Sequence, residues 1–218
     1  MTTVVVTGAS RGIGKAISEK FLSEGWQVIG TSTSGKAEIE HKNFKIYKLD
    51  LETPKTIEQF VEELAKQKVK IDSLINNAGV YLRDDDYPIP ETTLRKTLEI
   101  NLIGMIFLTD KLLPLVKDGG SIVNMSSGAG SISDYPDAHR PAYQISKIGV
   151  NMFTRSLSDF LANRNITVSS FNPGWVRTDM GGEDASRDPR EPAQEMYELV
   201  TSKVESGFFW HRGKKYPW

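Results

Sequence analysis

A tyrosine and a lysine stand four residues apart in the stretch RPAYQISKIGV, residues 140–150. If this stretch is helical, four residues are a little more than one turn, so Tyr143 and Lys147 project from the same face. Such a pair can be a plain aromatic–cation contact on a solvated surface. It can also place a cation beside a phenol, which favours the phenolate and lowers the pKa of the tyrosine toward neutrality. In the second case Tyr143 would act as an acid and a base.

The composition narrows the chemistry that is open to the chain. It has 218 residues, 27 Lys and Arg against 28 Asp and Glu, and a formal net charge of -1. This balance gives no electrostatic reason to expect nucleic acid or an anionic membrane as a partner. Because cysteine is absent and the three histidines are widely spaced, we expect no metal site. With no signal peptide and no apolar run of membrane-spanning length, we expect a cytoplasmic protein.

The elements that must position Tyr143 alternate between two periodicities. Apolar or alternating runs predict strands at 3–8, 26–32, 44–50, 71–79, 119–127 and 165–174. Helical patterns cover 12–23, 53–67, 91–117 and 141–163. About eleven residues separate the second strand from the third, too few for a full crossover helix, so we expect a loop or a single helical turn. The alternation predicts one α/β domain over residues 1–218, a doubly wound parallel sheet in three α/β/α layers.

The first predicted strand runs into a glycine-rich turn, TGASRGIG, at the start of the first predicted helix. Glycines at this place allow a tight turn, a close approach of backbone to a pyrophosphate, and close packing of helix on strand. Free N–H groups and the helix dipole at the same end attract phosphates. The alternative is a purely structural turn. The position between a strand and a helix favours a dinucleotide site.

The end of the second predicted strand bears on the choice between the two nicotinamide cofactors. A carboxylate there would bind the 2′-hydroxyl of the adenosine ribose and repel a 2′-phosphate. The chain instead has Ser32, Thr33 and Ser34, with no acidic residue before Glu38. Arg11, inside the glycine-rich turn, adds a planar cation that suits a phosphate. We therefore expect NADP(H) rather than NAD(H), the alternative being a polar surface turn with no part in cofactor choice.

Six segments together resemble the short-chain dehydrogenase/reductase family. They span residues 3–180 in the order and spacing of the family: TGASRGIG, NNAG at 76–79, Asn101, IVNMSS at 122–127, the Tyr143–Lys147 pair, and NPGWVRTDM at 172–180. The stretch GWVRTDMGG and the ending of the chain look like the C-factor and carbonyl-reductase-like branch. The stretch VIGTSTS is similar to NADPH-dependent 3-oxoacyl-carrier-protein reductases, whose usual C-terminal ending this chain lacks.

The resemblance implies a Rossmann-like fold and an NADP-dependent oxidoreductase of the carbonyl reductase or alcohol dehydrogenase type. Its substrate would be a small carbonyl compound or alcohol, and hydride would pass between the nicotinamide and the carbonyl carbon. Two alternatives are an NADP(H)-binding regulatory or signalling protein and a 3-oxoacyl-carrier-protein reductase. Because residues 91–117 and 141–163 match the dimer surface of much of the family, a homodimer or homotetramer is implied.

The resemblance also implies roles for single residues. Tyr143 matches the acid/base and Lys147 its partner, Ser127 the hydroxyl that orients the carbonyl, and Asn101 a residue that helps to hold a relay water. The positions that match cofactor contacts are Gly8, Ser10, Arg11, Gly12, Ile13, Gly14, Ser32, Thr33, Ser34, Asp50, Leu51, Asn77, Ala78, Gly79, Tyr143, Lys147, Pro173, Gly174, Val176 and Thr178. Ser127 lies sixteen residues before Tyr143, against about thirteen in the family, which predicts a longer substrate-side loop. Ser126 stays open as the alternative hydroxyl.

Four other features have a plain interpretation and a functional one. We expect the acidic stretch RDDDYP at 83–88 to be a solvated loop rather than a metal site, and His139 to be a surface residue rather than a substrate contact. The aromatic residues near the C-terminus are expected to form a seventh strand, not a substrate pocket or a dimer contact; they are Phe208, Phe209, Trp210 and Trp218. Residues 181–206 are weakly patterned and are expected to cover the substrate.

Overall fold

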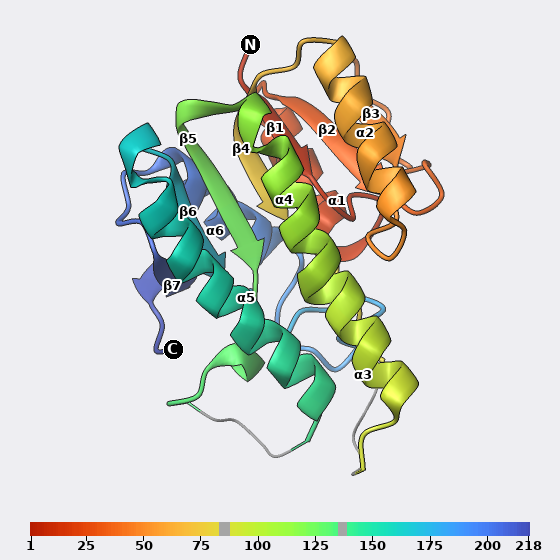
Figure 1. Cartoon of the computed structure of the whole chain (residues 1–218), viewed down its shortest axis with the longest axis vertical. Helices are drawn as coiled ribbons and strands as arrows, with labels where there is room; N and C mark the ends of the chain where they lie inside the picture. Colours follow the sequence, from red (N-terminus) through yellow and green to blue (C-terminus); the bar gives the residue numbers. More distant parts are fainter. Residues whose placement is uncertain (83–87, 135–138) are drawn as a thin grey trace.

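The alternating segments form a sheet that is covered by helices on both faces (Figure 1). The computed structural model describes residues 1–82, 88–134 and 139–218. Within these residues the strand order is β3-β2-β1-β4-β5-β6-β7-β8, and all neighbours are parallel except β7 and β8. The strands are β1 Thr3–Val6, β2 Gln27–Ser32, β3 Phe44–Lys48, β4 Ile71–Asn76, β5 Val116–Met125, β6 Thr167–Phe171, β7 Phe208–His211 and β8 Lys214–Lys215. The expected doubly wound, Rossmann-like sheet is confirmed.

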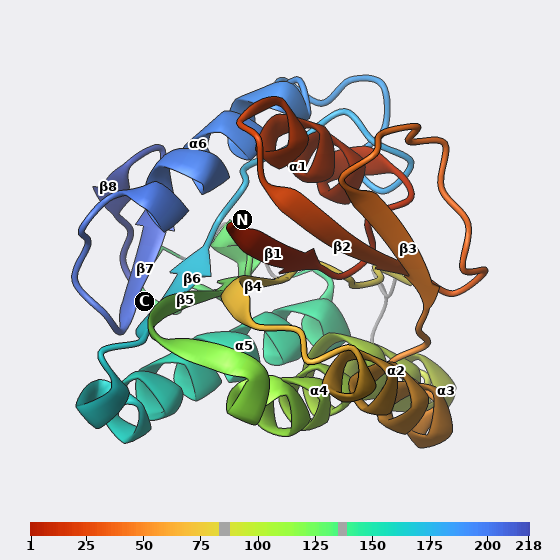
Figure 2. The same ribbon diagram turned by 90° about the horizontal axis from the view of Figure 1, so that it is seen from above.

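The helices complete a three-layer arrangement. Seen from above, α1 and α6 lie over one face of the sheet, and α2, α3, α4 and α5 lie over the other (Figure 2). The helices are α1 Gly12–Ser23, α2 Pro54–Lys66, α3 Glu91–Leu98, α4 Gly104–Leu112, α5 Pro141–Phe160 and α6 Arg190–Thr201. None of the helices in the described ranges is long and apolar enough to cross a membrane.

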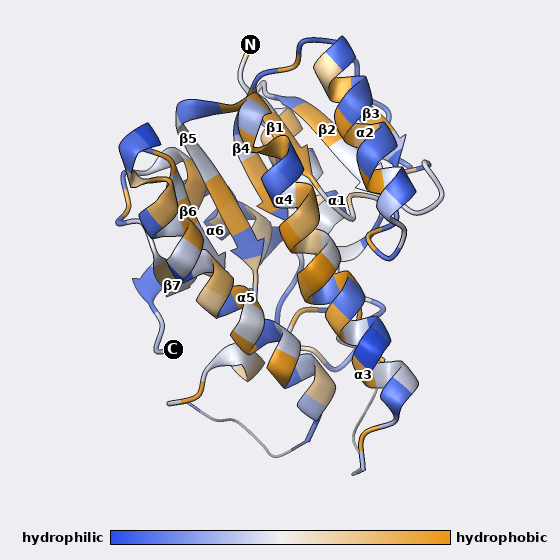
Figure 3. Ribbon diagram, viewed as in Figure 1, coloured by the Kyte–Doolittle hydropathy of each residue, from blue (hydrophilic) through white to orange (hydrophobic). Residues whose placement is uncertain are grey.

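Two hydrophobic cores hold the layers together, one on each face of the sheet. In β1 the side chain of Val5 packs into the core that contains Leu108 of α4, whereas Val4 and Val6 pack into the core that contains Phe21 of α1. Successive strand residues point to opposite faces, so a strand buried on both faces has a continuous apolar sequence. Figure 3 shows hydrophobic residues along the central strands and hydrophilic ones over much of α2 and α3.

The helical pattern at 91–117 is not one helix. It is divided into α3 and α4 by a π-helical turn, Glu99–Ile103, and it ends in a short 3₁₀ turn, Leu113–Leu115. Pro114 has no N–H to donate and cannot continue an α-helix. Strand β5 comes directly after this turn and begins at Val116, three residues earlier than expected. The interval between β2 and β3 contains no helix in the described chain, as predicted.

The last third of the chain contains more structure than its sequence pattern indicates. Helix α6 lies within the weakly patterned segment and packs on α1, where the rings of Tyr197 and Phe21 are 5.3 Å apart. The expected seventh strand is confirmed for Phe208, Phe209 and Trp210 as β7, which pairs with β6, and Phe209 is completely buried in it, whereas Trp218 lies beyond the strand. Trp218 stacks on Phe209 with ring centroids 5.6 Å apart. Strand β8, which returns antiparallel to β7, was not predicted.

Candidate active site

A cavity of about 1240 Å³ opens where the parallel strands end. The turns that follow β1, β2, β3, β4, β5 and β6 all contribute to its wall, together with the first two turns of α5. The strand order reverses between β1 and β4, and this is the point at which doubly wound sheets bind ligands. All predicted site residues line the cavity except Ser34 and Asn101. Segments far apart in the sequence therefore meet in one place.

The glycine-rich turn after β1 has glycine where another side chain would be strained or would clash. Gly8 and Gly12 have φ values of 68° and 53°, which glycine adopts without strain. A Cβ on Gly14 would lie 2.1 Å from the carbonyl oxygen of Gly8 and 2.5 Å from the amide nitrogen of Asn77. The turn is a cradle that leaves backbone exposed at the start of α1, where N–H groups and the helix dipole favour phosphate. It fits the pyrophosphate of a dinucleotide.

The NNAG segment holds the cradle from the side of β4. Nδ2 of Asn77 donates to the carbonyl oxygens of Thr7 and Gly8, at 2.9 and 3.3 Å. The hydroxyl of Thr7 accepts hydrogen bonds in return from the backbone N–H groups of Asn77 and Ala78, at 3.0 and 2.9 Å. The ends of β1 and β4 are thereby locked together beneath the turn. This is a physical reason for an asparagine at this position.

The residues expected to choose between cofactors lie at the same end of the sheet. Thr31, Ser32 and Thr33 line the cavity without a carboxylate among them, and the Ser32 hydroxyl accepts a hydrogen bond from the N–H of Lys36 at 3.1 Å. Arg11 is exposed on the cavity wall and forms an ion pair of 3.0 Å with Asp179. The arginine thus bridges the glycine-rich turn and the segment after β6.

Helix α5 brings Tyr143 and Lys147 together as the spacing predicts. Pro141 is its first residue, and the lysine Nζ lies 5.5 Å from the centroid of the tyrosine ring. Nζ donates a hydrogen bond of 2.8 Å to the carbonyl of Met125 at the end of β5. Lys147 is 4% exposed, and this burial lowers its pKa to about 8. The lysine therefore still carries its charge near neutral pH.

The protein surroundings act on Tyr143 in the opposite sense from our expectation. Burial raises the pKa of the phenol, while a hydrogen bond with Ser127 and the charge of Arg140 lower it by smaller amounts. The predicted lowering of the pKa by Lys147 is wrong for the protein alone. Its ammonium group is directed at the Met125 carbonyl and lies over the ring.

The two serines at the end of β5 have different surroundings. The Ser127 side chain lies close enough to the Tyr143 phenol to lower its pKa, and its hydroxyl accepts the N–H of Ala129 at 3.2 Å. Ser126 is 1% exposed, and its hydroxyl donates a long hydrogen bond of 3.4 Å to the carbonyl oxygen of Lys147. Neighbouring residues of an extended chain point to opposite sides. The geometry therefore places Ser127, and not Ser126, against the phenol.

Asn101 lies behind the cavity wall, in the π-helical turn between α3 and α4. Its side chain clamps Val80, accepting the N–H at 2.8 Å and donating to the carbonyl at 2.9 Å. A second donor bond of 3.2 Å reaches the hydroxyl of Ser146. A Cβ on Gly79 would lie 3.2 Å from Oδ1 of Asn101 and 3.7 Å from Nζ of Lys147, so the two side chains approach each other at this glycine. Interrupted helices of this kind often occur at functional sites.

Several cavity residues were missed by the sequence analysis. The ring of Tyr81 lies 5.4 Å from that of Tyr143, and His211 and Tyr216 line the cavity with their rings 5.4 Å apart. The two C-terminal residues are carried there by the hairpin of β7 and β8, and the hydroxyl of Tyr216 is hydrogen-bonded to Asp134. No sequence motif marks them. Only the return of the chain end to the site reveals their place.

The acidic stretch at 83–88 and His139 are the two polar features that were expected to have no part in the site. No group of His, Asp or Glu that could hold a metal ion occurs in the part of the chain that the structure describes. Most of the acidic stretch, residues 83–87, lies outside that part, and so do residues 135–138 of the predicted longer loop. His139 is exposed and is not among the residues that line the cavity.

Comparison with known proteins agrees with this geometry. The family model for short chain dehydrogenases matches residues 2–189. A 3-oxoacyl-[acyl-carrier-protein] reductase from Vibrio cholerae is 34% identical over 183 residues, which cover 81% of this chain and 74% of the relative. An NADPH-bound carbonyl reductase from chicken fatty liver is similar in structure, with a TM-score of 0.92 at 27% identity. The match covers 100% of this chain and 94% of the reductase chain. The carbonyl reductase Sniffer of Drosophila melanogaster has a TM-score of 0.90 at 26% identity, with 100% of both chains covered.

Proposed function

The chain belongs to the short-chain dehydrogenase/reductase family of oxidoreductases, and we propose that it is an NADPH-dependent enzyme of the carbonyl reductase or alcohol dehydrogenase type. The observation that carries the proposal is the Tyr143 phenol, close to Ser127 and beside the buried Lys147, in the cavity that the glycine-rich turn also lines. A cradle for a dinucleotide and a proton donor are thus combined in one cavity.

Each residue has a role that follows from its surroundings. Bound NADPH would supply the hydride. The Ser127 hydroxyl donates a hydrogen bond to the carbonyl oxygen of the substrate and stabilises the negative charge that develops there. Tyr143 gives its proton to the same oxygen, so that hydride and proton together convert the carbonyl into an alcohol. Because burial raises the pKa of Tyr143, the phenol is protonated near neutral pH, which is the form that reduction requires.

The proton that Tyr143 gives up has to be replaced before the next turnover. We propose that Lys147 and Asn101 support this return, because the two side chains approach each other at Gly79 beside the cavity. Asn101 would act through a water that its fixed amide group helps to hold. Its bonds to Val80 and Ser146 keep that amide group in one orientation.

The choice of NADP(H) is supported by three observations. Hydroxyl side chains replace a carboxylate at the end of β2, Arg11 lies on the cavity wall, and the similar carbonyl reductase from chicken has NADPH bound. Arg11 would leave Asp179 to pair with the 2′-phosphate, since both partners are exposed and an exposed ion pair contributes little stability.

Two further expectations stay proposals. Residues 181–206 would cover the substrate, although α6 within them packs on α1, and Gly181 is the residue of this segment that lines the cavity. Self-association into a dimer or tetramer is supported by exposed apolar side chains on the outer surfaces of α4 and α5, among them Phe107, Ile145 and Met152. The cytoplasmic location remains a prediction.

A 3-oxoacyl-carrier-protein reductase is the second candidate, favoured by the relative from Vibrio cholerae. It would use the same residues on an acyl thioester. The test is consumption of NADPH by the purified protein with ketones, quinones and 3-oxoacyl thioesters, each compared with NADH. Turnover of ketones or quinones supports the first candidate, and turnover of thioesters alone supports the second. Tight binding of NADPH without turnover of any of them would favour a regulatory protein.

A further inference from the structure

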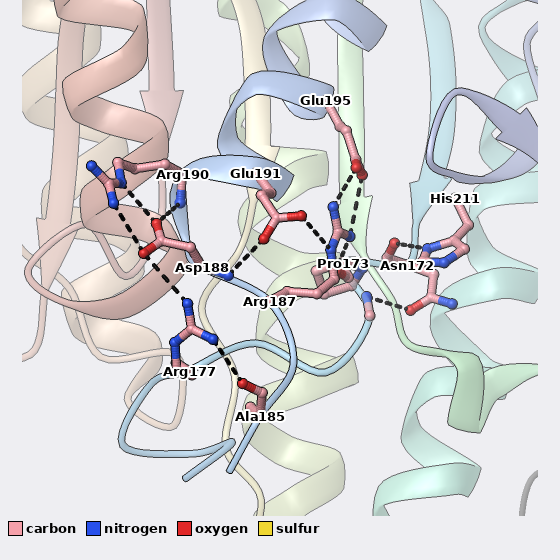
Figure 4. Close-up of polar contacts among 11 residues, drawn as sticks. Asn172, Pro173, Arg177, Ala185, Arg187, Asp188, Arg190, Glu191, Glu195 and His211 are labelled. Carbon is pink, nitrogen blue, oxygen red and sulfur yellow. Dashed lines mark hydrogen bonds and ion pairs between the residues drawn. The ribbon is translucent and has the colours of Figure 1, made fainter. Parts of the chain in front are cut away.

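Arg187 is a buried arginine that lies outside the cavity, behind the segment that follows β6 (Figure 4). It is 2% exposed, in a stretch of sequence that is otherwise polar and mostly exposed. Burial of a guanidinium is costly unless its donors are paired. Its partners therefore indicate what the arginine is for.

The guanidinium connects α6 to the first residues after β6. One terminal nitrogen donates a hydrogen bond of 2.5 Å to the carbonyl oxygen of Pro173, and the other is paired with the carboxylate of Glu195. Nε lies 3.6 Å from the carboxylate of Glu191. The planar fork of an arginine serves the carbonyl and the carboxylate from two separate nitrogens in a fixed geometry, whereas a lysine has one nitrogen, which cannot lie in both places.

The backbone of Arg187 is joined to the same segment. Its N–H donates to the carbonyl of Trp175 at 3.1 Å, and its carbonyl accepts the N–H of Arg177 at 2.9 Å. Gly174 has a φ of 75°, and a Cβ there would lie 2.9 Å from Cδ of Arg187. The arginine is therefore packed directly against the turn without lining the cavity itself.

The residue before Pro173 is fixed from a different element. Nδ1 of His211, on β7, lies 2.8 Å from the carbonyl oxygen of Asn172. Since a carbonyl can only accept, Nδ1 carries the hydrogen. The side chain of Asn172 accepts the N–H of Gly174 at 2.9 Å. The successive carbonyls of Asn172 and Pro173 thus each have a partner from outside the turn, His211 on β7 and Arg187 just before α6.

We propose that Arg187, paired with Glu195, is a positioning residue that fixes residues 172–178. This segment lines the cavity, and the family resemblance implies that it contacts the nicotinamide end of NADPH. This inference rests on the proposed function. Stability alone does not require the pair, because buried ion pairs can often be replaced by apolar residues without loss. What an apolar pair cannot replace is the bond to the carbonyl of Pro173.

The test separates these two contributions with the double variant Arg187→Leu/Glu195→Leu. Affinities are measured for NADPH, by the fluorescence of its nicotinamide, and for adenosine 2′,5′-bisphosphate, which has no nicotinamide. We expect a melting temperature close to that of the wild type, an NADPH affinity weaker by about tenfold, and an unchanged affinity for the bisphosphate. Arg190→Met is the matched control, because Arg190, the first residue of α6, pairs with Asp188 on the surface, and its replacement should leave all three values unchanged.

The outcomes separate this inference from the proposed function. Equal NADPH affinity in the double variant and the wild type would overturn the role proposed for Arg187 and would leave the proposed function standing. Parallel weakening of both ligands would also overturn it, since the arginine would then support the fold in general. Failure of the wild type to bind NADPH would remove the proposed function and this inference with it. If the double variant does not fold, Arg187→Lys keeps the charge opposite Glu195 and should lose NADPH affinity selectively.

Discussion

Replacement of Lys147 by methionine should make the protein more stable near neutral pH while abolishing its activity. The lysine is 4% exposed, and its charge is balanced by one hydrogen bond to the carbonyl of Met125. Methionine keeps most of the apolar stem and removes the charge. The site would thus maintain a destabilising group because the reaction uses it, as active sites commonly do.

The magnitude follows from the pKa of Lys147. Burial lowers this pKa from 10.5 for an exposed lysine to about 8, which corresponds to about 3 kcal/mol of lost stability while the lysine is charged. The variant also loses the hydrogen bond to the Met125 carbonyl, which costs about 1–2 kcal/mol. Near pH 7 the variant should therefore be more stable by about 1–2 kcal/mol.

The sign of the pH dependence provides a second, independent check. Between the pKa of about 8 in the folded protein and 10.5 in the unfolded chain, the unfolded chain binds more protons, so the wild type gains stability as the pH rises. From about pH 7 to about pH 9.5 this gain is about 2 kcal/mol, and the variant lacks it. The advantage of the variant should disappear over this interval.

Urea unfolding of both proteins at the two pH values measures the difference directly. Groups that titrate in both proteins cancel when the variant is compared with the wild type. The lost hydrogen bond cancels when the difference at one pH is compared with the difference at the other. Lys55→Met is the control, because Lys55 is exposed on α2. A stability difference between wild type and Lys147→Met that is the same at both pH values would refute the argument, because the ammonium would then not be held in a dry site.

Three other substitutions test single parts of the site. Ser127→Ala should lower kcat by about 10²-fold or more in steady-state assays, since a donor to the developing oxyanion is lost, whereas a similar loss in Ser126→Ala alone would reverse the assignment. Arg11→Met should weaken NADPH by about tenfold in binding titrations and leave NADH unchanged, and equal weakening of both would exclude contact with the 2′-phosphate. Gly14→Ala should abolish NADPH binding, because its Cβ would lie 2.1 Å from the carbonyl oxygen of Gly8, so retained affinity would contradict the cradle.

The parts of the fold that were predictable are those with a strong local signal. The continuous valines of β1, the glycine-rich turn and the four-residue spacing in α5 each follow from local geometry, and each occurs where it was expected. The π-helical turn around Asn101 was not predictable, because the helical pattern runs through it without a break.

The rest depends on contacts between distant segments. Arg187 lies in a charged stretch and would be expected at the surface, but its pairing with the backbone of residues 175–177 places it inside. His211 and Tyr216 reach the cavity only because the chain end folds back as a hairpin. The direction of the pKa change of Tyr143 depends on the depth of its burial, which no local pattern records.

Transfer of deuterium from cofactor to substrate is the measurement that tests the central claim most directly. NADPH labelled at the transferable position of the nicotinamide is incubated with a carbonyl substrate and the protein, and the alcohol is analysed by mass spectrometry. We predict one deuterium on the former carbonyl carbon with the wild type, and no labelled alcohol above background with Tyr143→Phe, which should still bind NADPH. Labelled alcohol formed equally well by Tyr143→Phe, or by neither protein with any carbonyl compound tested, would contradict the account.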